Sequence, residues 1–314
     1  MSFHVFTAYD PGAPSLLPAN GSICTVLDWA LQQAGWSIHR SSTFARIYRS
    51  PNGRYLYVDH NSAVSDDARV ATVRGCEGGE LNALLNPYPT VAQRPNYQST
   101  WQVGTFATQT PRDYRVVIKD DFFLFMTNSS PSFPAEAQSW ALHVFGEVPT
   151  PFDPTYACVI YTRPTAAGST GDLSSATTST NLSTPYGASV LHWQRNVDGS
   201  VLSTQGVLNA SGSSLGVVNG AQRARSGYQN RIYRESVFLN DLGTPAGNSG
   251  SLGLLKRGAI PQLWNGLHSS NGDLGHEDTF QDTAYDPAAV FRAYGGTGSP
   301  SWFIVEETDT WRPY

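Results

Sequence analysis

The 314-residue sequence has little charge and no long apolar run. Charged residues make up 14% of it, and the formal net charge is -5 at pH 7. The arginines are scattered and form no basic surface that could neutralise phosphates, so we expect no nucleic-acid partner. No run of about 18 apolar residues is present, and the first residues lack the basic start and apolar core of an export signal. The sequence predicts a soluble chain without membrane insertion.

Cysteine is also scarce. Cys24, Cys76 and Cys158 are far apart in the sequence, and none of them belongs to a C-x-x-C pair. Three such residues can build neither a disulfide framework nor a zinc site by themselves. We expect free thiols in the core, and no cofactor.

The residues that are plentiful favour strands and turns. The chain has 29 glycines, 20 prolines and 12% aromatic residues, a composition that suits short strands joined by turns better than a helical bundle. The predicted fold class is α+β and β-rich. A helix-on-sheet unit comes first, then a small β-sandwich or barrel-like module, then a C-terminal β segment.

One helix and one hairpin are the clearest local predictions. Residues 22–35, "SICTVLDWALQQAG", carry apolar residues at helical spacing, with Ser22 or Asn20 as the N-cap and Gly35 as the C-cap. The period then changes to two on both sides of the turn at 51–53, which predicts a β-hairpin. Further strands are expected within 68–75, 113–119, 122–128, 140–148 and 157–164.

The same patterns divide the chain into four parts. Residues 1–163 form the predicted N-terminal α+β domain, and the Ser/Thr/Gly-rich residues 164–183 form a linker or exposed loop. Residues 184–242 form the small β module. For residues 243–314, packing back on the N-terminal domain and forming a third module both remain open.

The motif "TPAGNSGSLG" at 244–253 resembles the loop that presents a serine-protease nucleophile. A nucleophilic Ser249 would need a base and a group that orients this base, and His60 with Asp120 or Asp121 has the required chain order. The small-residue run that normally precedes such a histidine is missing before His60. A flexible turn at Ser249 is the favoured interpretation.

Two groups of polar residues could bind a metal or catalyse a reaction, but a solvated surface position explains each of them more simply. The stretch "HSSNGDLGHED" contains His268, Asp273, His276, Glu277 and Asp278, but its spacing matches no closed metal motif and favours a solvated loop.

Glu306, Glu307 and Asp309 could suggest a glycosidase pair. Neighbouring residues of a strand point to opposite faces, so a solvated edge is favoured for this carboxylate group. The sequence therefore predicts no catalytic, cofactor-binding or metal-binding residues.

Aromatic side chains are the remaining candidates for function. Tyrosine and tryptophan favour protein interfaces and sugar-binding platforms, because they combine a large apolar area with a polar tip. Trp264, Trp302 and Trp311 are the interface candidates, and burial in the core is the equal alternative for each.

Several segments, taken together and in order, resemble a group of tailed-bacteriophage virion proteins. The similar segments cover most of the chain outside about residues 165–225. The segments are "FTAYDPGAPSLLPANGSICTVLDWALQQAGW", "FARIYRSPNGRYLYVDHNS", "ARVATVRGCE", "IKDDFFLFMTNSS", "WALHVFGEV", "RGAIPQLWNGLH", "DTF" and "FIVEETDTWRPY".

The resemblance implies a non-enzymatic structural protein of the virion, in the tail or baseplate, assembled in several copies. Its expected partners are other virion proteins and further copies of itself in a ring. The alternatives are a receptor- or glycan-binding virion protein that binds a host surface glycan, a head or collar decoration protein and, least favoured, a serine hydrolase that uses Ser249. The expected location is the virion, after synthesis in the host cytoplasm.

Overall fold

A computed structural model gives the structure of most of the chain. The described residues are 3–65, 68–88, 97–103, 109–128, 140–150, 157–166, 190–195, 205–210, 233–241, 255–267, 278–281, 286–294 and 302–311. Strands dominate them, and α1 (Ser22–Gln33) is the one helix longer than a single turn in this part of the chain.

Two large antiparallel sheets share the strand β12 (Cys158–Ala166). In the first sheet, β12 follows five strands that lie in the order in which they are named here. They are β2 (Ser37–Ser41), β3 (Ala45–Arg49), β4 (Tyr55–Asp59), β5 (Val70–Cys76) and β8 (Tyr97–Gln102).

The second sheet is longer and begins with the N-terminal strand. Four strands lead to β12: β1 (Phe3–Thr7), β9 (Tyr114–Lys119), β10 (Phe122–Asn128) and β11 (Trp140–Glu147). Beyond β12 the ladder continues through β13 (Val190–Trp193), β14 (Gln205–Ala210), β15 (Tyr233–Asp241), β16 (Leu255–Leu267), β19 (Trp302–Glu306), β18 (Val290–Tyr294) and β17 (Thr279–Gln281). Followed pair by pair, this sheet has β1 and β17 as its two ends.

The remaining elements are short. They are the single turn α2 (Ser62–Ser65) and the two-stranded hairpin of β6 (Gly79–Glu80) and β7 (Ala83–Leu84).

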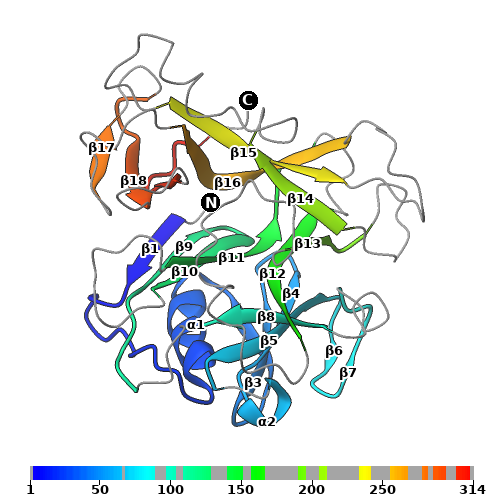
Figure 1. Cartoon of the computed structure of the whole chain (residues 1–314). Coiled ribbons are helices and arrows are strands. Elements are labelled where there is room, and N and C mark those ends of the chain that lie inside the picture. The colour runs from blue at the N-terminus through cyan, green and yellow to red at the C-terminus, as the bar shows by residue number, and fades with distance from the viewer. Residues whose placement is uncertain are drawn as a thin grey trace.

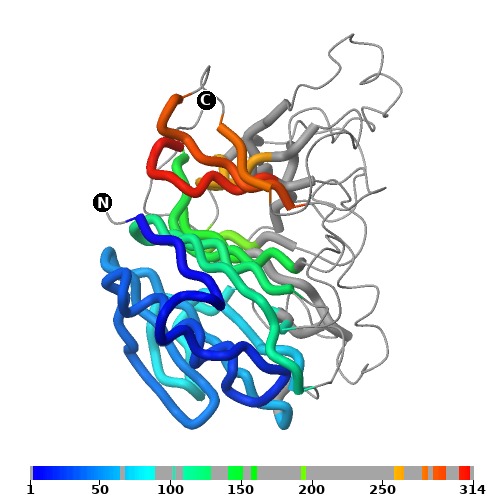
Figure 2. The backbone as a smooth tube through the Cα atoms, turned by 90° about the vertical axis from the view of Figure 1, so that its left-hand side faces the viewer, coloured from blue at the N-terminus to red at the C-terminus, as the bar shows by residue number. Residues whose placement is uncertain are grey.

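The elements lie in three levels (Figure 1). The C-terminal strands β15 to β18 are at one end, β9 to β11 are in the middle, and α1 with β3 to β5 is at the other end. Every residue of β10 is buried, because the middle strands have a packed layer on each face. Figure 2 shows the same arrangement from the side, with the red and orange C-terminal strands above the green middle strands.

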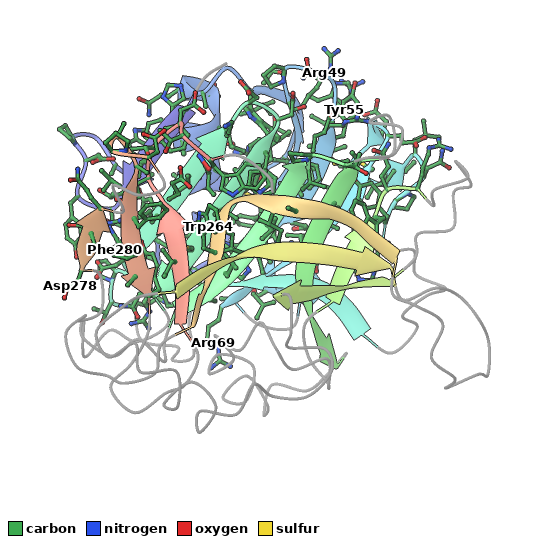
Figure 3. All side chains as sticks on the ribbon, turned by 90° about the horizontal axis from the view of Figure 1, so that it is seen from above. Arg49, Tyr55, Arg69, Trp264, Asp278 and Phe280 are labelled. Carbon is green, nitrogen blue, oxygen red and sulfur yellow. The ribbon has the colours of Figure 1, made fainter. Side chains whose placement is uncertain are left out.

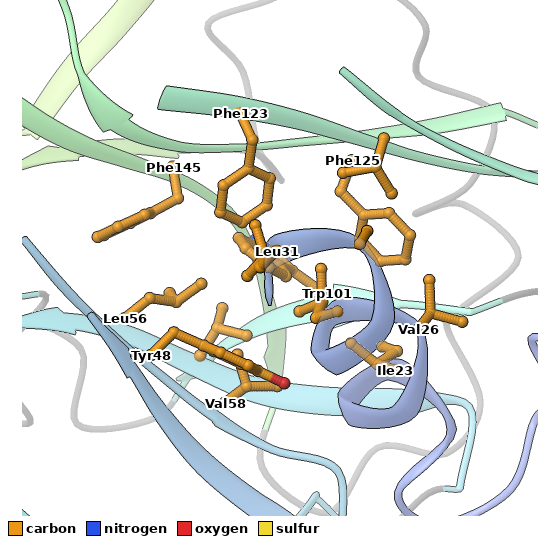
Figure 4. Packing of buried hydrophobic residues seen from close by; sticks show 14 of the residues in the cluster. Ile23, Val26, Leu31, Tyr48, Leu56, Val58, Trp101, Phe123, Phe125 and Phe145 are labelled. Carbon is orange, nitrogen blue, oxygen red and sulfur yellow. The ribbon is translucent and has the colours of Figure 1, made fainter. Parts of the chain in front are cut away.

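The core between α1 and the strands is apolar (Figure 4). Helix residues such as Ile23 and Leu31 pack against Phe123 and Phe145 of the middle strands and against Tyr48 of the hairpin. The helix ends within one residue of the predicted C-cap: Ala34 is the C-cap, Gly35 follows it with a φ of 86°, and the Trp36 amide donates to the Leu31 carbonyl at 3.0 Å.

A second apolar core lies on the other face of β9 and β10. Leu124 and Val117 of the middle strands pack there with Leu263, Tyr294 and other residues of the C-terminal strands. The C-terminal segment therefore packs back on the N-terminal part of the chain, which was one of the two possibilities that the sequence left open.

The β-rich fold class with its helix-on-sheet start is confirmed. The hairpin around residues 51–53 is also present, with Gly53 at a φ of 87°. The four-part division stays a prediction. β12 extends to Ala166 and pairs with β13, so the ladder continues from the first predicted unit into the third. Residues 167–183 of the predicted linker lie outside the described residues.

Candidate functional site

His60 is a structural residue, completely buried at the start of α1. Its Nδ1 accepts a hydrogen bond from the Ile23 amide at 3.0 Å, and its Nε2 lies 2.9 Å from the Ala68 carbonyl oxygen. These distances fit a neutral ring that accepts at Nδ1 and donates from Nε2. His60 thus satisfies one of the free amides at the helix N-terminus and has no ring nitrogen left for a nucleophile.

The N-cap predicted at Ser22 or Asn20 is therefore wrong. Gly21 occupies that position without a side-chain hydrogen bond to the helix. The Ser22 hydroxyl instead accepts from the Leu17 amide at 2.6 Å, and the Asn20 side chain accepts from the Ser62 amide at 2.9 Å. The capping group comes from a residue 37 positions away in sequence, which no local sequence pattern reveals.

The two aspartates considered beside His60 also have structural roles. Asp121 is buried and accepts from the Asn52 amide at 2.8 Å, which fixes the turn between β3 and β4. Asp120 occupies the β9–β10 turn at a φ of 51°. Ser249 lies outside the described residues. The structure therefore does not bring the proposed triad members together in the part of the chain that it describes.

Of the three C-terminal carboxylates, Asp309 is exposed, but Glu306 and Glu307 do not lie on the solvated edge that the sequence favours. Glu306 is fully buried, and the Glu307 side chain is 11% exposed. The reason is that β19 is an inner strand, paired with β16 on one side and β18 on the other. The prediction that neighbouring carboxylates point apart holds, because the two residues have different partners.

Glu307 joins the C-terminal segment to the middle layer. It binds Arg115 of β9 and, at 2.9 Å, the Nε of Arg292 of β18. The Arg115 guanidinium also lies 6.0 Å from the centre of the Tyr294 ring. Because two arginines share one carboxylate in a nearly buried place, the charge of Glu307 is needed to offset theirs. Lys119 and Asp309 add an ion pair at 2.8 Å, more exposed to solvent.

Glu306 and two of the predicted interface residues lie in a smaller core of the C-terminal segment. The Trp264 indole donates to Glu306 at 3.0 Å, and the Thr310 hydroxyl donates to the other carboxylate oxygen. Trp264 is 2% exposed and Trp311 is 5% exposed, and both pack in one cluster with Phe291. Figure 3 shows Trp264 among packed side chains, whereas Asp278 and Phe280 lie at the outer margin.

This burial gives Trp264 and Trp311 a role inside the fold, so neither presents a surface to a partner. Trp302 belongs to β19, and its side chain lies outside the described part, so its interface role stays a prediction. In the stretch 268–278, for which the sequence favours a solvated loop over a metal site, only Asp278 is described, and it is exposed. Among the described residues, no group of three histidine, cysteine or acidic side chains could hold a metal ion.

A second polar network joins the strand ends near β13. Glu77 accepts from Arg195 at 2.7 Å, from Gln194 at 3.1 Å and from Asn86 at 2.7 Å. Burial by itself would raise the pKa of Glu77, but these hydrogen bonds outweigh it and hold the pKa below the ordinary value of 4.5. Arg54 and Glu147 extend the network through a 2.9 Å ion pair.

The three cysteines are free and buried, as the sequence predicts. Burial raises the pKa of Cys24 and of Cys158 to about 12, and that of Cys76 to about 11. Only the thiolate is an effective nucleophile. These side chains are therefore packing residues and not reactive groups.

Comparisons with known proteins add no relative. No model of a known protein family matches the chain, and no curated protein matches it in sequence. In the described part of the chain, no helix is long and apolar enough to cross a membrane.

Proposed function

We propose that this chain is a non-enzymatic structural component of a tailed-phage virion, placed in the tail or baseplate and present in several copies. The sequence resemblance carries this proposal, and the positions of the similar segments support it. The segments "IKDDFFLFMTNSS", "WALHVFGEV" and "RGAIPQLWNGLH" coincide with β10, β11 and β16. In these three segments, most of the residues that carry the likeness are strand residues of the packed layers.

Within the part of the chain that the structure describes, four polar residues that could suggest an enzyme have partners that account for them. His60 caps a helix, Asp121 fixes a turn, and Glu306 and Glu307 hold the C-terminal strands. Each of these interactions stabilises a particular arrangement of strands. A protein that serves as a framework for assembly needs such stabilising contacts and no reactive group.

Mass spectrometry of purified particles tests the proposal. Particles of the phage that encodes the chain are purified through a density gradient and washed in moderately high salt. We expect the chain to remain with the particles in several copies, because a chain with 14% charged residues should be held mainly by apolar contacts. Its absence from infectious particles would contradict the proposal.

Two rival functions have their own tests. A glycan array with the full chain tests a receptor- or glycan-binding role, and specific binding to a sugar would favour it. A fluorophosphonate probe tests the hydrolase interpretation. Labelling that is lost in Ser249→Ala would support that interpretation.

A further inference from the structure

Among the described residues, no strand pairs with the outer edge of β1. β1 runs from Phe3 to Thr7 and has β9 as its partner strand in the described ladders. It lies at one end of the second sheet and faces the viewer in Figure 2, beside the green middle strands. An edge strand presents a row of backbone donors and acceptors that another strand can use.

The hydrogen bonds show which backbone groups of β1 point outward. The Ala8 amide donates to the Tyr114 carbonyl of β9 at 3.2 Å. In an antiparallel strand, alternate residues direct their backbone amide and carbonyl groups to the same neighbouring strand. The backbone groups of Phe6 and His4 therefore also form hydrogen bonds with β9. The backbone groups of Phe3, Val5 and Thr7 therefore point away from β9.

Asp10 independently confirms this orientation and closes one end of the edge. Its carboxylate accepts from the Thr7 amide at 2.7 Å, and its own amide donates to the Thr7 carbonyl at 3.3 Å. The outward groups of Thr7 are thus satisfied within the chain. The amide and carbonyl groups of Phe3 and Val5 have no backbone partner among the described residues.

The other two ends of the large sheets are poorer templates. β2 is interrupted by a register shift between Ile38 and Arg40, and Arg40 pairs with Glu80 on its surface. β17 has three residues. β1 has five residues without an acidic or basic side chain other than His4, without proline and with a regular register. In the described part of the chain it has none of the lysines, prolines or bulges by which many natural edge strands avoid pairing.

We propose that β1 pairs with β1 of a second copy of this chain, antiparallel and about a two-fold axis at His4. In this register Phe3 lies opposite Val5 of the second copy, and Val5 lies opposite its Phe3. Each such pair exchanges two backbone hydrogen bonds, so the pairing uses all the outward groups that Asp10 leaves open.

Two features favour a second copy as the partner. The free groups sit at two alternate residues, Phe3 and Val5, and a symmetric copy supplies the same spacing in the opposite direction. The facing side chains are apolar or aromatic, which stabilises cross-strand pairs, and the His4 ring already stacks on Phe6 at 5.6 Å. Such a contact is self-complementary and closes as a dimer. The inference is linked to the proposed function at one point: the β1–β1 pairing would be one contact between the copies of the proposed assembly.

Sedimentation equilibrium of the full chain over a series of concentrations tests this pairing. The Val5 amide points away from β9, so Val5→Pro removes an outward donor and leaves the β1–β9 hydrogen bonds in place. We expect the dimer dissociation constant to rise at least about tenfold, because each dimer loses two hydrogen bonds. Val5→Thr keeps the amide and the branched side chain and is the matched control. Thermal unfolding of each variant establishes that it is folded.

A second variant acts without changing the backbone. His4→Lys would place two ammonium groups opposite each other across the proposed axis, and we expect it to weaken the dimer as well. The proposal is overturned if the wild-type chain is monomeric at all concentrations, or if folded Val5→Pro and His4→Lys dimerise like the wild type.

Particle incorporation separates this inference from the proposed function. A wild-type dimer that weakens in both variants supports the inference even if the chain is absent from virions, and that absence would contradict the proposed function alone. A monomeric chain whose Val5→Pro variant is lost from particles would mean that β1 accepts a strand of another virion protein. That result would overturn the second copy as partner and leave the proposed function standing.

Discussion

The two faces of the middle layer are stabilised in different ways. Toward α1, the core consists of apolar and aromatic side chains, and Trp101 contacts Phe123 and Phe125 without exposure to solvent. Toward the C-terminal strands, an apolar core is combined with the nearly buried Arg115–Glu307–Arg292 cluster. Apolar contacts tolerate small shifts of one layer against the other. A carboxylate shared by two arginines instead requires one arrangement of the strands that carry these side chains. The difference suggests that α1 supplies general stability and that the C-terminal segment is held in one particular position.

Trp101→Ala should have the largest effect, because it removes a fully buried tryptophan from the α1 core. We expect a loss of about 3–5 kcal/mol in the free energy of unfolding, the usual cost of such a truncation. Chemical denaturation monitored by circular dichroism measures it. Trp101→Phe is the control and should cost less. A change in Trp101→Ala below about 1 kcal/mol would contradict the packing described here.

Trp311→Ala tests whether the C-terminal aromatic residues act inside the fold. Because Trp311 is 5% exposed and packs in the small core with Trp264 and Phe291, we expect a loss of about 3 kcal/mol in stability. Differential scanning calorimetry of the free chain gives the value. Unchanged stability together with poor incorporation into particles would return Trp311 to the interface.

Glu307→Gln tests the charge cluster between the layers. The substitution keeps the size of the side chain but leaves Arg115 and Arg292 without their shared counter-charge, so we expect a loss of about 1–3 kcal/mol. The matched control is Asp309→Asn, which breaks the more exposed pair with Lys119 and should change stability by less than about 1 kcal/mol. If the two substitutions lowered the free energy of unfolding equally, the charge cluster would not be a distinguishing feature of the C-terminal face of the middle layer.

The pH dependence of stability should show the smallest effect. Because the pKa of Glu77 is lowered in the folded chain, its contribution is present above the unfolded value of 4.5 and is lost as the pH falls through the folded pKa. Thermal unfolding of wild type and Glu77→Gln across this acidic range measures it. The two curves should approach each other as the pH falls, and curves that stay parallel would count against the proposed hydrogen bonds.

Local patterns in the sequence predict helices, strands and turns better than they predict which distant residues contact each other. The apolar period of α1, the Gly35 end and the turn at 51–53 are local features, and the structure contains all three. The helix cap could not be read in the same way, because His60 reaches the helix from another part of the chain. Glu307 appeared to be solvated for a similar reason: its burial depends on β9, a strand about 190 positions earlier, whose Arg115 binds it.

The site residues show the same limit. The sequence does not show which tryptophans are buried. Trp264 and Trp311 are buried because residues of β16, β18 and β19 pack with them into one small core of the C-terminal segment. The sequence likewise did not predict the edge position of β1. It depends on Asp10 satisfying Thr7 and on β9 taking the other side of the strand.

A density map of the intact virion at low resolution tests the central claim most directly, with the chain located by a labelled terminus. We expect several copies arranged symmetrically in the tail or baseplate, with protein density on the β1 side of each copy. A virion map without the labelled chain, from particles that are fully infectious, would contradict its assignment as a structural component.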